Sequence, residues 1–331
     1  MAVLANGQPT LLDVSTQFTA DGKPLPIAEL LHKKNPALND IPFEEANTAA
    51  GHRMSARQDL PATALRRINK GVAPTKSQYG TILESTGLFA GLGQVDSKLV
   101  ELAGDKAQFR MNENEGHIES MGQRFFQSML YGDPSVTPEE FLGIAPRFAS
   151  LAGTSLVKEQ IIDAGGNDTD LTSIYLIGWG NKSVMGIYPK GSQAGIVHKD
   201  MGEELVSDGS GGQYPALRDW FELDAGLAVY DYRNVVRIAN IDLSSLTTNA
   251  ATGAKLIELM TLALEGLNNT DGLNPVFYVP RKIRSYLRLQ ITNKANVWLN
   301  MKEVAGEMVT AFDSVPVRRM DSILLNESRV T

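Results

Sequence analysis

Residues 311–324, near the C-terminus, have the sequence AFDSVPVRRMDSIL. Short apolar runs separated by polar residues and a proline are typical of extended chain and unlike a helix. We therefore expect strands over residues 307–312 and 315–319, followed by a third extended segment over residues 321–325. The chain thus closes in β structure.

Two blocks in the centre of the chain have a similar texture. Residues 174–196 have the sequence IYLIGWGNKSVMGIYPKGSQAGI, and residues 227–242 have the sequence LAVYDYRNVVRIANID. Each block contains two apolar runs separated by a short polar connection, at residues 180–183 in the first and 233–234 in the second. We expect a β-hairpin from the first block and a second strand pair from the other.

Helical patterns lie on both sides of these blocks. Apolar side chains recur at helical spacing over residues 95–131, and the stop signal at residues 132–134 (Gly-Asp-Pro) should end that helix. We expect kinks or close packing at Gly116 and Gly122, because glycine is a poor helix former. A further helix is expected over residues 138–151. Beyond the central blocks, the pattern predicts a helix, a strand and a second helix, over residues 252–267, 275–279 and 280–291.

The first 90 residues differ from the rest, because seven prolines interrupt them. Each proline fixes its own φ, lacks an N–H and biases the preceding residue toward extended backbone. We expect a long arm or excursion here and not a folded domain. Such a segment needs a surface to lie on, and a neighbouring copy of the chain is the simplest candidate.

The composition excludes several classes of protein. The net charge of −7 argues against nucleic-acid binding by bulk attraction, although residues 51–80 contain six basic residues and one acidic residue. This basic stretch could bind an anion or another copy of the chain. The absence of cysteine excludes thiolate metal sites and thiol catalysis. We find no signal peptide and no apolar run long enough to span a membrane, so a soluble protein of a reducing compartment is expected.

No catalytic constellation is apparent in the sequence. A phosphate-binding P-loop and the GxSxG motif of hydrolases are absent, and the glycine-rich residues 87–93 do not match the GxGxxG pattern. The four histidines lack the spacing of a metal site. Asp168 and Asp170 resemble a fragment of a calcium-binding loop, but the glycine and distal glutamate of an EF-hand are missing. We therefore expect no enzyme activity, no cofactor and no metal.

Three acidic residues lie on the predicted long helix: Glu113, Glu115 and Glu119. Glu115 and Glu119 are four residues apart and share one helical face. A solvated or subunit-facing acidic stripe explains them better than a catalytic pair, since no pocket is indicated around them.

Along the chain, a basic excursion and a long helix are followed by the two central blocks and then by the C-terminal block. Together these features resemble the major capsid proteins of tailed phages with the HK97 fold. The central blocks are most similar to the short-tailed branch that includes epsilon15 and the Bordetella phage BPP-1. The resemblance implies an α+β, HK97-like capsid fold with an N-terminal arm, an extended loop (E-loop), a peripheral (P) domain with a spine helix, and an axial (A) domain around a central sheet. It places these parts at residues 1–46, 47–83, 84–150 (spine helix about 95–131) and 151–331, the last with strands that return to the P domain.

The resemblance also implies a function and partners. The chain would form pentamers and hexamers of an icosahedral shell, assembled in the cytoplasm of a bacterial host as a procapsid and found in the virion. Scaffolding, portal and cement or decoration proteins are the expected partners, and double-stranded DNA would be packaged inside without sequence-specific binding. Residues of the E-loop are then expected to meet acids of a neighbouring spine helix: Arg53, Arg57, Arg66 and Arg67 against Glu113, Glu115 and Glu119.

Two other readings of the sequence stay open at this point. The chain could be another virion component, such as a portal or decoration protein. Less favoured is an α/β enzyme that uses a nucleotide, with its domain between residues 227 and 291, because no phosphate-binding loop accompanies it.

Overall fold

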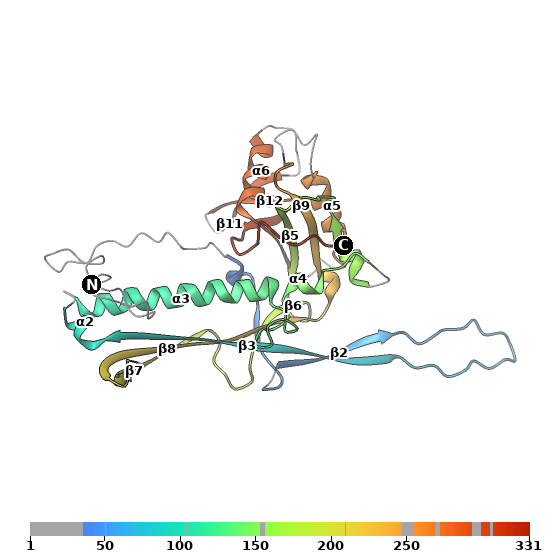
Figure 1. Cartoon of the computed structure of the whole chain (residues 1–331). Helices are drawn as coiled ribbons and strands as arrows, with labels where there is room; N and C mark the ends of the chain where they lie inside the picture. The colour runs from blue at the N-terminus through green and yellow to red at the C-terminus, as the bar shows by residue number, and fades with distance from the viewer. Residues whose placement is uncertain are drawn as a thin grey trace.

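The computed structural model consists of an upright lobe, a flat limb and a projecting hairpin (Figure 1). The lobe contains strands β5 (Leu171–Trp179) and β9 (Val235–Asp242) and helices α5 (Leu256–Glu265) and α6 (Arg281–Thr292). In the limb, helix α3 (Lys106–Tyr131) lies along strands β3 (Gln78–Asp96) and β8 (Gln213–Val229). Strand β2 (Gly51–Asp59) forms with β3 a hairpin that points away from α3, on the other side of the lobe. The structure describes residues 36–49, 51–102, 105–152, 156–208, 210–246, 255–268, 272–292, 299–304 and 307–331.

One sheet of thirteen strands connects all three parts in the described portion of the chain. Its main path follows the order β11 (Leu299–Val304), β12 (Glu307–Phe312), β13 (Val315–Arg319), β10 (Asn274–Val279), β5 (Leu171–Trp179), β6 (Val184–Tyr188), β8, β3 and β2. The remaining strands pair with members of this path or with each other: β1 (Phe43–Glu45), β4 (Ile161–Asp163), β7 (Ile196–Ser207) and β9 (Val235–Asp242).

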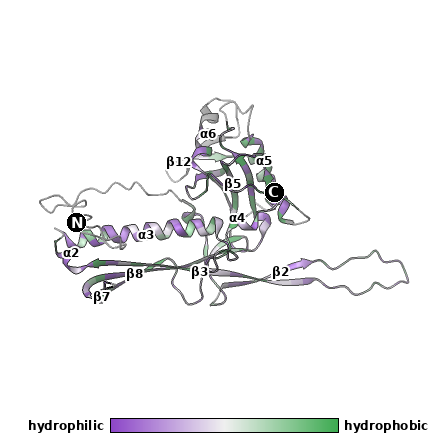
Figure 2. Cartoon of the chain, viewed as in Figure 1, coloured by the Kyte–Doolittle hydropathy of each residue, from purple (hydrophilic) through white to green (hydrophobic). Residues whose placement is uncertain are grey.

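The core lies in the lobe, on both faces of β5. Every residue of β5 is buried, as expected for a strand covered on both sides. Tyr175 and Ile177 pack in a cluster that includes the C-terminal half of α3, whereas Ile174 and Leu176 pack on the opposite side. Helices α5 (Leu256–Glu265) and α6 (Arg281–Thr292) cover that opposite side. Hydrophobic residues accordingly concentrate in the strands of the lobe (Figure 2).

Local signals define both ends of α3. The carboxylate of Asp105 caps its N-terminus by accepting hydrogen bonds from the backbone N–H groups of Ala107 and Gln108, each at 3.1 Å. Gly132 ends the helix, and a Cβ there would lie 2.4 Å from the carbonyl oxygen of Phe141. Only glycine fits this crossing of two chain segments.

Several expected boundaries are wrong. The region 95–131 is the end of β3, a short helix α2 (Ser97–Leu102) and α3, because the extended backbone of β3 continues to Asp96 beside β8. Gly116 and Gly122 are not close-packed, since a Cβ on either would meet no atom within 4 Å. The expected helix over 138–151 is only α4 (Ile144–Arg147), preceded by turns. The remaining short helical turns are η1 (Pro36–Asn39), η2 (Leu156–Gln160) and η3 (Tyr232–Asn234).

The expected strand pairs are also wrong, although most strands exist. β5 and β6 do not form a hairpin: they meet only at Trp179 and Val184, and in parallel. β6 pairs instead with β8 and with β1. β9 pairs with β5 and β4, not with β8. No strand forms over residues 321–325, which contain turns.

Other expectations are confirmed. The helix, strand and helix predicted over 252–291 are α5, β10 and α6, and the closing strands are β12 and β13 with the expected bounds. None of the described helices is long and apolar enough to span a membrane. Of the expected N-terminal arm, residues 1–35 lie outside the described residues. Residues 36–46 include β1, which pairs in parallel with β6.

Candidate subunit interfaces

The end of the β2–β3 hairpin, residues 60–77, is the most exposed described segment, and we call it the hairpin tip. It carries four exposed large apolar side chains, of which Leu65 is 103% and Ile68 is 91% exposed. Arg66 and Arg67 lie between them and are exposed as well. Arg66 donates only to a carbonyl within the tip, that of Lys70, at 3.0 Å. Contiguous apolar and basic groups with so little contact in their own chain indicate an interaction surface.

The two other predicted arginines lie on β2. Arg53 is exposed, and Arg57 donates to the hydroxyl of Tyr79 on β3 at 3.2 Å. This hydrogen bond and the charge of Arg57 lower the pKa of Tyr79. Among the described residues, none of the four arginines at positions 53, 57, 66 and 67 forms an ion pair with a carboxylate.

The three predicted acids lie on α3, as expected. Glu115 is exposed, and Glu119 accepts a hydrogen bond from Gln123 at 2.6 Å. Glu113 is half-buried. The hairpin and α3 extend to opposite sides of the lobe, so a single chain does not bring these acids to the arginines (Figure 1). Contact between the two sets requires a second copy.

A buried ion pair, which was not predicted from the sequence, fixes the base of the hairpin. Arg147 of α4 donates to both carboxylate oxygens of Glu84 on β3, at 2.7 and 2.6 Å. The two side chains are 15% and 5% exposed. Gly51, which pairs with Ser85 next to Glu84, has φ +144°, and a Cβ there would lie 2.1 Å from the carbonyl oxygen of Glu84. The direction in which the hairpin leaves the body is therefore set by buried, charged contacts.

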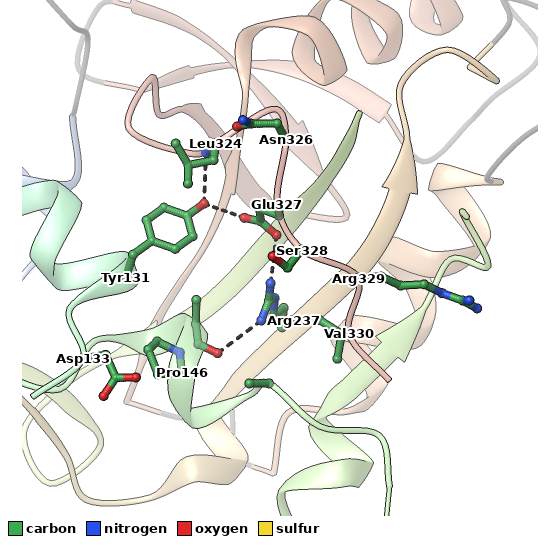
Figure 3. A pocket seen from close by; sticks show the side chains of 12 residues that line it. Tyr131, Asp133, Pro146, Arg237, Leu324, Asn326, Glu327, Ser328, Arg329 and Val330 are labelled. Carbon is green, nitrogen blue, oxygen red and sulfur yellow. Dashed lines mark hydrogen bonds and ion pairs between the residues drawn. The ribbon is translucent and has the colours of Figure 1, made fainter. Parts of the chain in front are cut away.

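A second buried cluster joins the end of α3 to the sheet of the lobe (Figure 3). Arg237 on β9 lies 2.8 Å from a carboxylate oxygen of Glu327, and both side chains are 5% exposed. Tyr131, the last residue of α3, donates to the other oxygen of Glu327 at 2.5 Å. Burial and the neighbouring negative charges raise the pKa of Tyr131 far above its usual range, so its hydroxyl stays a donor. These side chains border a cavity of about 510 Å³.

The C-terminal segment, residues 321–331, is bound along this cluster. Its backbone also forms hydrogen bonds to the rest of the chain. The N–H of Glu327 donates to the carbonyl of Leu171 on β5 at 2.8 Å. Val330 exchanges two hydrogen bonds with the side chain of Asn240, at 2.8 and 2.9 Å. The N–H of Leu151 donates to the carbonyl of Thr331 at 3.0 Å. The segment thus straps the limb to the lobe.

An apolar hollow of about 500 Å³ opens beside α3, and we call it the helix-side hollow. Residues of α3, η1, β1 and β8 line it, together with the end of β6, the start of β7 and the loop between them. Its lining is mostly apolar and includes Leu38, Phe43, Gly122, Phe126, Ile196 and Leu223. Leu38, Phe43 and Ile196 remain partly exposed there. Asp224 is the one carboxylate in the lining, and it accepts a hydrogen bond from Ser192 at 3.0 Å.

Comparison with known proteins matches residues 19–331 to the model of the family described as major capsid protein GP7. The chain belongs to this family. The solved structure of bacteriophage Epsilon15 contains a chain that is 33% identical to this one, with a TM-score of 0.80 and coverage of 100% of this chain and 99% of that one. The bacteriophage JBD30 capsid is a more distant match, with 10% identity, a TM-score of 0.47 and coverage of 89% and 92%. No curated protein matches the chain in a sequence comparison.

This GP7-family chain therefore has the HK97-like capsid fold, and it is a major capsid protein that forms the shell of a phage virion with copies of itself. It is a structural protein and not an enzyme, a portal or a decoration protein. The expected absence of catalytic machinery agrees with this role.

Two clusters in the capsid protein were only partly visible in its sequence. Asp168 and Asp170, noted in the sequence as a fragment of a calcium-binding loop, lie close to Asp242, and one carboxylate oxygen of each lies within 4.8 Å of the other two. Hydrogen bonds from Ser245 and Ser244 lower the pKa of Asp242 to about 2, which keeps it charged. The rings of His117 on α3 and His198 on β7 both stack against Phe221, with ring centroids 5.4 and 4.8 Å from that of Phe221.

The cluster around Phe221 fastens α3 to the sheet of the limb. His198 lies 2.7 Å from the buried carboxylate of Asp219, and Arg110 of α3 donates to the same carboxylate at 2.9 Å. The contacts of α3 in this cluster, Arg110 with Asp219 and His117 with Phe221, join residues more than 100 positions apart, which explains why sequence spacing did not reveal them.

Proposed function

We propose that this capsid protein builds its shell from pentamers and hexamers in which the hairpin of one subunit lies over the next. In this proposal residues 1–46 are the N-terminal arm, 47–83 the E-loop, 84–150 the P domain and 151–331 the A domain, whose last strands return to the P domain. The exposed hairpin tip is the observation that carries the proposal. Its apolar and basic groups face solvent in one chain and acquire partners only in an assembly.

Opposite charges favour contact between the hairpin of one subunit and α3 of the next. The arginines at 53, 57, 66 and 67 are exposed on the hairpin, and α3 presents Glu115 in the open together with the less exposed Glu113 and Glu119. An exposed ion pair contributes only about 0–1 kcal/mol. The same pairs repeat at every subunit boundary of a closed shell, so small contributions add up over the whole assembly.

Further partners follow from the role of a shell. Scaffolding and portal proteins are expected during assembly in the host cytoplasm, and the related JBD30 phage provides a procapsid and a capsid decorated with minor capsid protein trimers. Double-stranded DNA is the expected content. The net charge of −7 suits a wall that encloses a polyanion without binding it tightly.

The proposal is tested by reversing charge at the tip, with the double variant Arg66→Glu/Arg67→Glu. We expect subunits that fold normally, because both side chains are exposed, and a loss of shells in electron micrographs. Arg281→Glu/Lys282→Glu on α6 is the matched control, since it reverses two adjacent exposed basic residues in the lobe. Adding Glu115→Arg/Glu119→Arg to the tip variant should restore assembly. Normal shells from the tip variant would refute the assignment.

A further inference from the structure

The helix-side hollow is an apolar surface without a described partner. Its volume of about 500 Å³ is ample for one or two large side chains, and Leu38, Phe43 and Ile196 stay partly exposed around it. An exposed group of large apolar side chains at one concave site indicates a binding surface.

The hollow is continuous with the acidic stripe of α3. Gly122 lines the hollow, Glu119 precedes it by three residues and Glu115 by seven, so all three lie on one helical face. Phe126, four residues after Gly122, lines the hollow too. With Asp224 also in the lining, the hollow has an apolar floor and a negatively charged approach.

The hairpin tip has the complementary composition. Leu65 and Ile68 are almost fully exposed, and Arg66, Arg67 and Lys70 stand beside them. Within one chain the hairpin points away from α3, whose residues Gly122 and Phe126 line the hollow, so the tip does not cover its own hollow (Figure 1). Each copy therefore offers one apolar, basic projection and one apolar, acidic recess.

We propose that the helix-side hollow of each subunit receives the apolar tip side chains of the next subunit's hairpin, chiefly Leu65 and Ile68. The site deepens the proposed function, since it rests on the hairpin lying over a neighbour. The neighbouring arginines then lie along the stripe of Glu115 and Glu119. A heterologous contact of this kind, projection to recess, closes into rings when the rotation per subunit is right.

Gly122 allows this site to be blocked without harm to the fold. A Cβ at Gly122 would meet no atom within 4 Å, so Gly122→Phe fills the hollow from its own wall. Any residue but proline also raises helix propensity over glycine. Gly116→Phe is the matched control, because its Cβ is equally free and its position lies six residues away, about 240° around the helix.

We expect Gly122→Phe subunits to keep the thermal stability of the wild type and to need about tenfold or more protein to form shells, the factor that burial of one large apolar side chain supplies. Gly116→Phe should assemble as the wild type does. Equal assembly of both variants would overturn the proposal.

Cross-linking identifies the occupant. The chain contains no cysteine, so Leu65→Cys/Gly122→Cys introduces the only thiols. Oxidised particles should yield a ladder of disulfide-linked subunits on a non-reducing gel, and Leu65→Cys/Gly116→Cys should not. If Gly122→Phe blocks assembly and no ladder forms, another segment fills the hollow and the proposal is wrong.

These results separate the two proposals. Loss of shells on charge reversal at the tip, together with normal shells from Gly122→Phe, would leave the hairpin contact standing and remove only the hollow as its site. Normal shells from the charge-reversed tip would remove the hairpin contact itself.

Discussion

Replacement of Glu327 by glutamine should destabilise the subunit strongly, although the side chain keeps its size. Arg237 is 5% exposed, and Glu327 is the carboxylate that lies within ion-pair distance of it. Breaking one partner of a buried pair costs about 3–5 kcal/mol, because the other charge stays buried without compensation. That is a large part of a typical stability of about 5–15 kcal/mol. At roughly 2 °C per kcal/mol, the melting temperature should fall by about 6–10 °C.

The assay is thermal unfolding of unassembled subunits, followed by circular dichroism. Glu101→Gln is the control, because the pair of Lys98 and Glu101 has a similar separation of 2.7 Å but side chains that are 74% and 52% exposed. Its melting temperature should match that of the wild type. Arg237→Met added to Glu327→Gln should recover much of the loss, since no charge then remains buried. If Glu327→Gln alone melts within about 2 °C of the wild type, which corresponds to roughly 1 kcal/mol, the buried pair of Arg237 and Glu327 does not stabilise the subunit as argued.

Two further predictions concern other charged contacts. Glu84→Gln should cost about 3 kcal/mol, because it leaves Arg147 without its carboxylate; limited proteolysis should then cut residues 51–96 faster, and unchanged cleavage would contradict a fixed hairpin base. Asp242→Asn should lower stability at neutral pH: a carboxyl whose pKa falls from 3.8 to about 2 on folding stabilises the folded state above pH 3.8, and this contribution disappears as the pH falls toward 2. Denaturant midpoints of both proteins should therefore converge over that range, and a constant difference would contradict the prediction.

Local pattern predicted the elements of the fold better than their partners. The strands β12 and β13 and the helices α5 and α6 were predicted correctly, because each carries a complete signal of apolar period and breaker residues within its own length. The strands around residues 180–183 were also recognised, but their short connection suggested a hairpin. Apart from one bridge to β5, the neighbours of β6 are β8 and β1, about 40 and 140 residues away, and no local signal encodes such pairing.

The candidate interfaces show the same division. Exposed residues of known sign, such as Arg66 and Glu115, could be proposed from composition and helical spacing, because surface charge needs no tertiary information. Glu327 could not, since it lies in a turn-rich C-terminal segment where an acid is ordinarily solvated. Its burial depends on Arg237 and Tyr131, which are 90 and 196 residues distant.

The wrongly predicted helix over residues 138–151 contains the most instructive contact set. Its only helical part, α4, touches all three parts of the subunit. Arg147 binds Glu84 at the hairpin base, and Arg237 of the lobe donates to the carbonyls of Ala145 and Phe148 at 3.2 and 2.8 Å. Just before α4, the N–H of Gly143 donates to the carbonyl at the end of α3, that of Gly132, at 2.8 Å.

A longer helix at α4 would satisfy those carbonyls internally and remove two of the acceptors of Arg237. The short helix instead exposes them to the lobe. Arg147 then holds the hairpin to this small element, Arg237 holds the central sheet, and the backbone of Gly143 holds the end of the spine helix. A rotation of the hairpin relative to the lobe must then break or carry along the contacts of Arg147. We infer that α4 couples the base of the hairpin to the lobe. The double variant Glu84→Gln/Glu327→Gln tests this coupling. If its loss of unfolding free energy equals the sum of the losses of the two single variants, the two sites are independent and α4 does not couple them.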